Sequence, residues 1–355
     1  MLLDDEKSIA MIDAGNVRAS IDALPDQIAS AYAEASRLRV PVSYENADQV
    51  VVAGMGGSSL PAHLVQSVYG SVLRVPFSFI NGYTLPGSVG KKSVVILSSY
   101  SGTTEEVLAC FKDAQKRGAR IVGIASGGAL AKALSRAKAP AFIFDPIHNP
   151  CHQPRMGLGY MVTGLIVILE KLGVLTAGAE LATVAERLRA DISEYSINVP
   201  SRSNPAKLMA SALNGTVPVI ISAEHLIGNG HIMQNQIHES PKQFCAAFPL
   251  PELNHHLMEG LAFPKDTARL LSFVFLESDL YSKRLAIRVK ATQKVLAKQG
   301  YGYNSWSASS ATRLEQAYEA LAFGSWLSFY MAIQNRTNPS NIPWVNFFKK
   351  ELSKE

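Results

Sequence analysis

Residues 50–63 read VVVAGMGGSSLPAH, the pattern of a buried strand followed by a glycine-rich turn and the start of a helix. Gly56 and Gly57 favour a tight turn, because glycine adopts positive φ angles and lets a ligand approach the backbone closely. Ser58 and Ser59 are good helix N-cap residues. A helix that begins here offers free N–H groups and its positive dipole end to an anion. The stretch therefore predicts a strand, turn and helix with room for a ligand at the turn.

Three interpretations of this turn compete. A dinucleotide site requires an acidic residue about 20 positions further on for the ribose hydroxyls, and residues 49–104 contain no Asp or Glu. A purely structural turn remains open, since tight strand-to-helix turns favour glycine in any protein. Because two serines stand at the predicted cap, we favour a small anion such as a phosphomonoester.

A similar strand, turn and helix pattern recurs further along the chain, where residues 98–106 read SSYSGTTEE after the apolar run at 94–97. Four hydroxyl side chains flank a glycine there: Ser99, Ser101, Thr103 and Thr104. One hydroxyl suffices to cap a helix, so a cap with surplus solvated hydroxyls is one interpretation. The other is a ligand site, because open α/β sheets bind ligands at the carboxyl ends of their strands. We favour half of a phosphate clamp.

Short β-rich runs alternate with amphipathic segments along most of the chain. Strands are predicted at 50–53, 75–80, 93–98, 121–125 and 141–144, and again at 217–222, 271–276 and 301–305. Helices are predicted at 60–69, 104–117, 155–172, 180–195, 283–298 and 311–331, and near Ile232. This alternation predicts an α/β fold with two doubly wound parallel-sheet domains and flanking helices.

The stretch NVPSRSNP at 198–205 interrupts the alternation with prolines and polar turn residues, so we place the boundary between the domains there. The predicted division is a helical N-terminal segment, two α/β domains and a C-terminal tail helix: 1–45, 46–196, 197–338 and 339–355.

Composition excludes several classes of protein. The net charge of +5 over 355 residues is scattered, without the basic cluster of a nucleic-acid binder. The longest apolar stretch, at 156–169, is too short and too rich in glycine to cross a membrane. The three cysteines form no CxxC pair and the first residues resemble no signal peptide, so we expect a reduced, cytoplasmic protein.

A metal site is a weak alternative. His148, Cys151 and His152 lie within five positions, but no second cluster of ligands follows them. We therefore expect incidental side chains in a loop, and neither a metal nor another cofactor.

The pair GMGGSS and SYSGTT resembles the sugar isomerase (SIS) domain, an α/β module that binds phosphosugars. With the segment NQIHESPKQFCAAFPLPELNHHLMEG at 235–260, the chain is similar to the bifunctional phosphoglucose/phosphomannose isomerase family from about residue 48 to the end. The resemblance implies two SIS-type domains, a homodimer, and reversible isomerisation of glucose 6-phosphate or mannose 6-phosphate to fructose 6-phosphate without a cofactor.

The resemblance also assigns roles to residues. Ser58, Ser99, Ser101 and Thr104 would hold the substrate phosphate, with Gly56, Gly57 and Thr103 beside them. Glu239 would be the catalytic base, and His255 would open the sugar ring from the neighbouring subunit. Arg155 would lie near the reacting oxygens, and Lys349 would assist ring opening.

The same roles fit the chemistry. Aldose–ketose isomerisation moves a proton between adjacent carbons through a cis-enediol, and one carboxylate can both remove and return that proton. An arginine can stabilise the negative enediolate oxygens, and a histidine titrates in the range useful for ring opening. The neighbours His256 and Lys350 are alternatives to His255 and Lys349, and Glu239 on residue type alone is an ordinary helix acid.

The chain departs from the family pattern at two positions. Ile342 stands where the family has a threonine connected with the mannose epimer, and Thr103 stands where many relatives have asparagine. Two other functions remain open: a phosphosugar sensor without catalysis, and an isomerase of a different phosphosugar.

Overall fold

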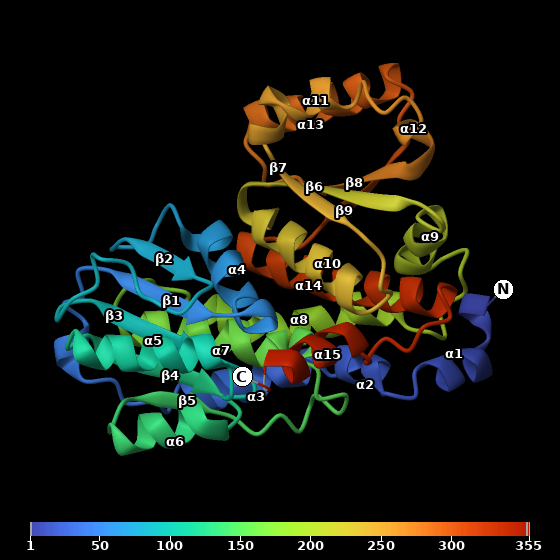
Figure 1. Cartoon of the computed structure of the whole chain (residues 1–355). Coiled ribbons are helices and arrows are strands. Elements are labelled where there is room, and N and C mark those ends of the chain that lie inside the picture. Colours follow the sequence, from blue (N-terminus) through green and yellow to red (C-terminus); the bar gives the residue numbers. More distant parts are fainter. Residues whose placement is uncertain (1, 353, 355) are drawn as a thin grey trace.

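Two parallel sheets organise the chain in the computed structural model, which describes residues 2–352 and 354 (Figure 1). The first sheet has the order β2-β1-β3-β4-β5, formed by β1 (Val50–Gly54), β2 (Phe77–Ile80), β3 (Val94–Ser98), β4 (Arg120–Ala125) and β5 (Ala141–Ile143). The second has the order β7-β6-β8-β9, formed by β6 (Val217–Ala223), β7 (Ala246–Leu250), β8 (Leu271–Ser278) and β9 (Tyr303–Ala308). The predicted α/β class with two parallel sheets is confirmed.

Helices cover both faces of each sheet. The N-terminal part contains α1 (Glu6–Ile12), α2 (Val17–Asp22), α3 (Leu24–Ala35) and the 3₁₀ helices η1 (Leu2–Asp4) and η2 (Val42–Tyr44). Around the first sheet lie η3 (Gly56–Ser58), α4 (Leu60–Tyr69), α5 (Glu105–Lys116), α6 (Gly128–Arg136), η4 (Pro154–Met156), α7 (Leu158–Lys171) and α8 (Gly178–Tyr195).

Around the second sheet lie α9 (Pro205–Ala212), η5 (Glu224–Leu226), α10 (Ile227–Glu239), η6 (Glu252–His255), α11 (Leu257–Gly260), α12 (Thr267–Leu270), α13 (Lys283–Lys298) and α14 (Arg313–Gln334). The last helix is α15 (Pro343–Leu352). In Figure 1, α10 and α14 lie on one side of the second sheet, and α11 and α13 on the other.

The central strands of the first sheet are apolar because helices cover both of their faces. Every residue of β1 and β3 is buried, as continuous rather than alternating apolar runs predict. Helix α14 connects the two halves: Tyr318 packs into the core of the first sheet, whereas Phe323 and Trp326 pack into the core of the second. Tyr318 also shares a hydrogen bond of 2.8 Å with Thr163 of α7.

Several elements differ from the sequence prediction, which also lacks the short helices α11 and α12. Strand β7 was missed because its sequence AAFPL contains a proline, which strands tolerate at a sheet edge, and β7 is an edge strand. The helix predicted at 155–172 begins only at Leu158, after the separate 3₁₀ turn η4 that carries Arg155. Helix α9 was missed inside the proposed boundary region, where Asn204 caps it by accepting from the N–H groups of Ala206 and Lys207.

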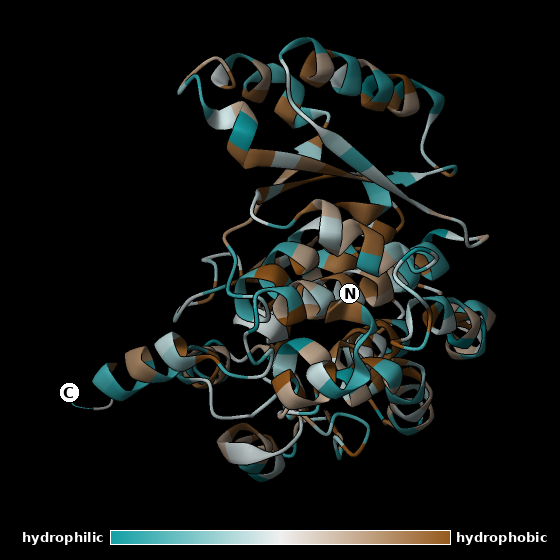
Figure 2. Cartoon of the chain, turned by 90° about the vertical axis from the view of Figure 1, so that its right-hand side faces the viewer, coloured by the Kyte–Doolittle hydropathy of each residue, from teal (hydrophilic) through white to brown (hydrophobic). Residues whose placement is uncertain are grey.

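The division of the chain into domains at residues 196 and 197 stays a prediction. Within the described residues, no helix is long and apolar enough to cross a membrane. Figure 2 shows α15 projecting from the body of the molecule, with apolar and polar residues both on its surface. None of the residues of α15 is buried.

Candidate active site

A cavity of about 550 Å³ opens where the turns after β1 and β3 meet η4, the end of α10 and α15. It brings together most of the residues predicted from the sequence: Gly56, Gly57, Ser58, Ser101, Thr103, Thr104, Arg155, Glu239 and Lys349. The predicted residues Ser99 and His255 do not line it. The carboxyl ends of β1 and β3 are adjacent in the sheet, so the two hydroxyl-rich loops necessarily lie side by side.

The first loop is fitted closely to the turn that carries Arg155. Gly56 has a φ of 48°, which favours glycine. A Cβ atom on Gly57 would lie 3.1 Å from the backbone nitrogen of Arg155, so a larger residue would push η4 away. Ser58 is buried, and its Oγ accepts a hydrogen bond of 2.8 Å from the N–H of Tyr100. Ser58 thus connects the two loops while its own O–H remains available as a donor.

The second loop holds its hydroxyls in pairs. Ser99 Oγ and Thr104 Oγ1 lie 2.9 Å apart, as do Ser101 Oγ and Thr103 Oγ1. Ser99 is fully buried and accepts from the N–H of Gly102 at 3.1 Å, so its position in the structure is inside the loop rather than on the cavity wall. Gly102 has a φ of 65°, and a Cβ there would lie 1.9 Å from the carbonyl oxygen of Gly127.

The first turn of α5 faces this cavity through Thr104, Glu105 and Glu106. Thr104 is the N-cap residue, and its side chain makes no capping hydrogen bond. The first backbone N–H groups of a helix have no partner within the helix, and they carry its positive dipole end. Glu105 accepts a short hydrogen bond from the Tyr83 hydroxyl, which raises the pKa of Tyr83 to about 12.

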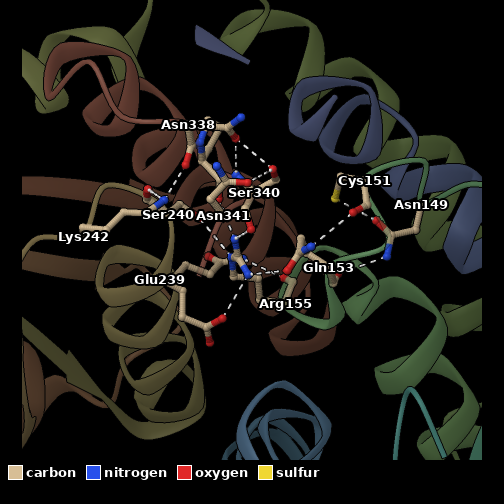
Figure 3. Close-up of polar contacts among 12 residues, drawn as sticks. Asn149, Cys151, Gln153, Arg155, Glu239, Ser240, Lys242, Asn338, Ser340 and Asn341 are labelled. Atoms are coloured by element: carbon tan, nitrogen blue, oxygen red, sulfur yellow. Dashed lines mark hydrogen bonds and ion pairs between the residues drawn. The ribbon is translucent and has the colours of Figure 1, made fainter. Parts of the chain in front are cut away.

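Arg155 is the most highly connected side chain at the cavity, and it is 1% exposed. Nη1 donates to Glu239 Oε2 and to Gln153 Oε1, each at 3.0 Å. Nη2 donates to the carbonyl oxygens of Pro339 at 2.5 Å and Ser340 at 3.1 Å, and Nε donates to Ser240 Oγ at 3.2 Å. Figure 3 shows the guanidinium at the centre of this network. All five of its N–H bonds therefore have acceptors within the protein.

Burial lowers the pKa of Arg155, and the nearby Glu239 carboxylate opposes that effect. A guanidinium stays protonated under such conditions. Glu239 is the last residue of α10, and 29% of its side chain is exposed. The ion pair therefore combines a fixed buried cation with a carboxylate that a ligand in the cavity can reach.

Helix α15 closes one side of the cavity. Val345, Phe348, Lys349 and Leu352 line it, at the spacing of one helix face, together with Ile342 just before the helix. The neighbouring Lys350 does not line it. Of the two predicted lysines, the structure thus brings Lys349 to the cavity.

The predicted histidine, His255, and its alternative, His256, lie away from this cavity. His255 is exposed at the end of η6, beyond the edge strand β7, and His256 pairs with Glu252 at 2.7 Å. Within one chain, neither lines the cavity. Among residues 2–352 and 354, no group of three or more His, Cys, Asp and Glu side chains could hold a metal ion, and this includes His148, Cys151 and His152. The Cys151 thiol instead donates a hydrogen bond of 3.2 Å to Asn149 Oδ1.

Several participants were not predicted. Arg155 is bound by Gln153, Ser240 and the backbone carbonyls at 339 and 340. Lys242 binds the adjacent carbonyl oxygen of Asn338. Residue type gives no signal for a backbone acceptor. Ser240 and Lys242 follow Glu239 in the sequence HESPK at 238–242, but the proline at 241 is equally typical of an ordinary helix end. The sequence therefore did not indicate that these two residues belong to the site.

Comparison with known proteins is consistent with this arrangement. Residues 43–135 match the SIS domain, and residues 202–352 match the bacterial phospho-glucose isomerase C-terminal SIS domain. A hypothetical protein from Thermus thermophilus shares the fold, with a TM-score of 0.76 over 98% of this chain and 94% of that one, at 16% identity.

Two relatives bear the name bifunctional phosphoglucose/phosphomannose isomerase. The protein from Thermoplasma volcanium is 26% identical over 86% of this chain and 92% of its own length. The protein from Caldicellulosiruptor bescii is 30% identical over 340 residues, which are 94% of this chain and 98% of its own length. The chain therefore belongs to the bifunctional phosphoglucose/phosphomannose isomerase family.

Proposed function

We propose that the chain catalyses the reversible aldose–ketose isomerisation of hexose 6-phosphates, interconverting glucose 6-phosphate and fructose 6-phosphate through a cis-enediol. The names of the relatives support this reaction. The observation that carries the proposal is the ion pair of 3.0 Å between Arg155 and Glu239, in a cavity whose other wall has the hydroxyl loops and the start of α5. The hydroxyl loops and the start of α5 suit a phosphate, and the Arg155–Glu239 pair suits proton transfer.

The phosphate end of the substrate would bind at the two loops. Ser58, Ser101, Thr103 and Thr104 present hydroxyls at the cavity, and Gly56 and Gly57 allow close approach of the backbone. The uncapped start of α5 adds N–H donors and the positive end of the helix dipole. Ser99 would contribute indirectly, by orienting Thr104.

The reacting end would lie against Glu239. Its carboxylate would take the proton from one carbon and return it to the adjacent carbon, without a metal or other cofactor. Because all five N–H bonds of Arg155 have protein acceptors, we propose that this residue acts by orienting Glu239 and by placing a permanent positive charge near the enediolate. Lys349 would assist ring opening from α15.

The proposed function also includes a homodimeric assembly and a cytoplasmic location. His255 would open the sugar ring across the interface of a homodimer, which accords with its exposure and its absence from the cavity of its own chain. A cytoplasmic location and a division into domains at 46–196 and 197–338 also belong to the proposal.

The test of the reaction is a coupled assay that starts from fructose 6-phosphate and detects glucose 6-phosphate. The proposal expects turnover by the wild type that a chelator does not remove. A phosphosugar sensor would instead show thermal stabilisation by fructose 6-phosphate without turnover, and a different isomerase would act only on another sugar phosphate in a parallel screen. Either result would refute the proposed reaction.

A further inference from the structure

The segment at residues 338–341 connects α14 to α15 and is bound by two cationic side chains (Figure 3). Three consecutive carbonyl oxygens accept from them: Asn338 from Lys242 Nζ, and Pro339 and Ser340 from Arg155 Nη2. Charge-assisted hydrogen bonds of this kind are roughly twice as strong as neutral ones. These hydrogen bonds from Lys242 and Arg155 therefore help to fix the backbone of the connecting segment, in addition to the packing of its side chains.

Lys242 links the connecting segment to the helix that carries Glu239. Its Nζ also donates to the carbonyl oxygen of Ser240, the C-cap residue of α10, at 2.9 Å. Its backbone has a φ of 56°, a left-handed conformation that lysine rarely adopts, so the surrounding contacts hold it there. Lys242 is an exposed residue, but partial desolvation of its amine and the neighbouring Arg155 lower its pKa to about 8.

The opposite side of the connecting segment is held by close contact. A Cβ atom on Gly15 would lie 2.0 Å from Ser340 Oγ and 2.4 Å from Ser340 Cβ. Only glycine at position 15 therefore leaves room for the segment in its present place. The segment is confined between Gly15 on one side and Lys242 and Arg155 on the other.

Helix α15 depends on this segment for its position. None of its residues is buried, and Trp344 and Phe348 are 80% and 60% exposed, so packing against the body holds it weakly. Yet the helix brings Lys349 to the cavity. The direction in which it leaves the connecting segment must accordingly fix where Lys349 lies.

We propose that Lys242 is a positioning residue, which holds the connecting segment so that α15 places Lys349 over the cavity. The consequence for catalysis rests on the proposed function, whereas the consequence for the order of α15 does not. Misplacement of a catalytic group by about 1 Å can reduce the rate about 100-fold. Loss of the Lys242 contacts should therefore affect turnover more than substrate binding, because the phosphate loops are untouched.

The test compares Lys242→Met with the wild type. Two readouts are needed: kcat and KM with fructose 6-phosphate, and amide hydrogen exchange of residues 338–352. We expect kcat to fall about 10-fold to 100-fold with KM changed less than about 3-fold, and exchange across α15 to become faster. Lys242→Arg, which retains charge and donors, should recover most of kcat. Lys294→Met on the outer helix α13 is the matched control and should behave as the wild type.

A second variant keeps the test decisive if Lys242→Met does not fold. Gly15→Ala must displace Ser340 from the other side, so it should produce the same lowered kcat and faster exchange of α15 with Lys242 intact. Unchanged kcat in both variants, or lowered kcat with unchanged exchange of α15, overturns the proposal. If the wild type does not isomerise any sugar phosphate, the proposed function fails, and the exchange data alone decide whether Lys242 positions α15.

Discussion

At the scale of single residues, the structure separates hydroxyls that face the cavity from those that build the loop. Ser101 lines the cavity, whereas Ser99 is buried and holds Gly102 and Thr104 in place. The sequence motif gives both serines equal weight, because burial cannot be read from a run of hydroxyl residues. The two residues therefore predict different phenotypes.

The first prediction contrasts Ser101→Ala with Ser99→Ala. A hydrogen bond to a charged group contributes about 1.5–3 kcal/mol, so loss of the Ser101 hydroxyl should raise KM for fructose 6-phosphate about 10-fold to 150-fold with little change in melting temperature. Ser99→Ala removes the buried hydroxyl that pairs with Thr104 Oγ1, while the Gly102 N–H keeps the Ser99 carbonyl oxygen as an acceptor at 3.0 Å. It should therefore lower stability by about 1 kcal/mol, the effect of about one hydrogen bond. Steady-state kinetics and thermal unfolding of both variants check this. The same KM and melting temperature in both would contradict the assignment.

The second prediction concerns Ile342, which lines the cavity and stands at the position for which the family resemblance suggests a threonine. An apolar side chain offers no hydrogen bond to a sugar hydroxyl, so we expect poor use of mannose 6-phosphate relative to glucose 6-phosphate. Ile342→Thr should raise the ratio of kcat/KM for mannose 6-phosphate over glucose 6-phosphate about 5-fold to 10-fold, the effect of about one hydrogen bond. Measurement of both substrates with both proteins decides it, and an unchanged ratio would count against this role.

At the scale of elements, the sequence predicted the framework well and the connections poorly. Apolar runs and 3.6-residue periodicity identified β1, β3, α4 and α13, because burial on both faces or along one stripe leaves a clear pattern. The edge strand β7 and the turn η4 have no such pattern. The five hydrogen bonds of Arg155 could not be predicted, because four of its acceptors lie more than 80 residues away in the chain and two of those are backbone carbonyls.

The elements that meet between the two sheets suggest a third prediction, on acid sensitivity. His63 of α4 packs against His231 of α10 with ring centroids 4.2 Å apart and the rings tilted by 31°, and it also contacts Phe79. Burial, with the neighbouring His231, lowers the pKa of His63 to about 4. These two rings lie in a second, separate pocket, and within the described residues no carboxylate lines it. The unfolded chain, with an ordinary histidine pKa of about 6.5, binds the proton more readily in this range. The free energy of unfolding should therefore fall as the pH drops from 6.5 to 4.

Because the His63 ring is partly solvated, we expect the free energy of unfolding to fall by about 1–2 kcal/mol between pH 6.5 and pH 4. Urea unfolding at pH 7 and pH 5 measures it. His63→Phe, which keeps an aromatic ring against Phe79, should make stability less dependent on pH over the same range. An equal loss of stability in the wild type and in His63→Phe would show that other groups cause it.

At the scale of the whole molecule, the cavity lacks the ring-opening histidine that the family resemblance assigns, because His255 lies beyond β7 in the same chain. A homodimer that brings in the partner's residue is the arrangement we propose. Helix α15 has no buried residue, and Figure 2 shows it projecting from the body of the molecule. Sequence reasoning placed this histidine only through the family resemblance, since no local pattern marks a residue that acts across an interface.

The fourth prediction tests that arrangement with mixed subunits. Glu239→Gln and His255→Gln should each be nearly inactive alone. After unfolding and refolding together, half of the dimers should be mixed, and each mixed dimer would contain one intact site, so activity should return to about a quarter of the wild type. No recovery in a preparation shown to contain mixed dimers would place His255 in the site of its own chain or outside catalysis.

The central claim is that Glu239 moves the proton in a cis-enediol isomerisation. The most direct measurement follows conversion of fructose 6-phosphate to glucose 6-phosphate in D₂O, with deuterium at carbon 2 of the product detected by mass spectrometry or NMR. The wild type should turn over and incorporate solvent deuterium. Glu239→Gln, which retains an oxygen for Arg155, should lose about 10²–10⁴-fold in kcat. Turnover of Glu239→Gln at the wild-type rate, or rapid wild-type turnover without any incorporation of deuterium, would contradict the account.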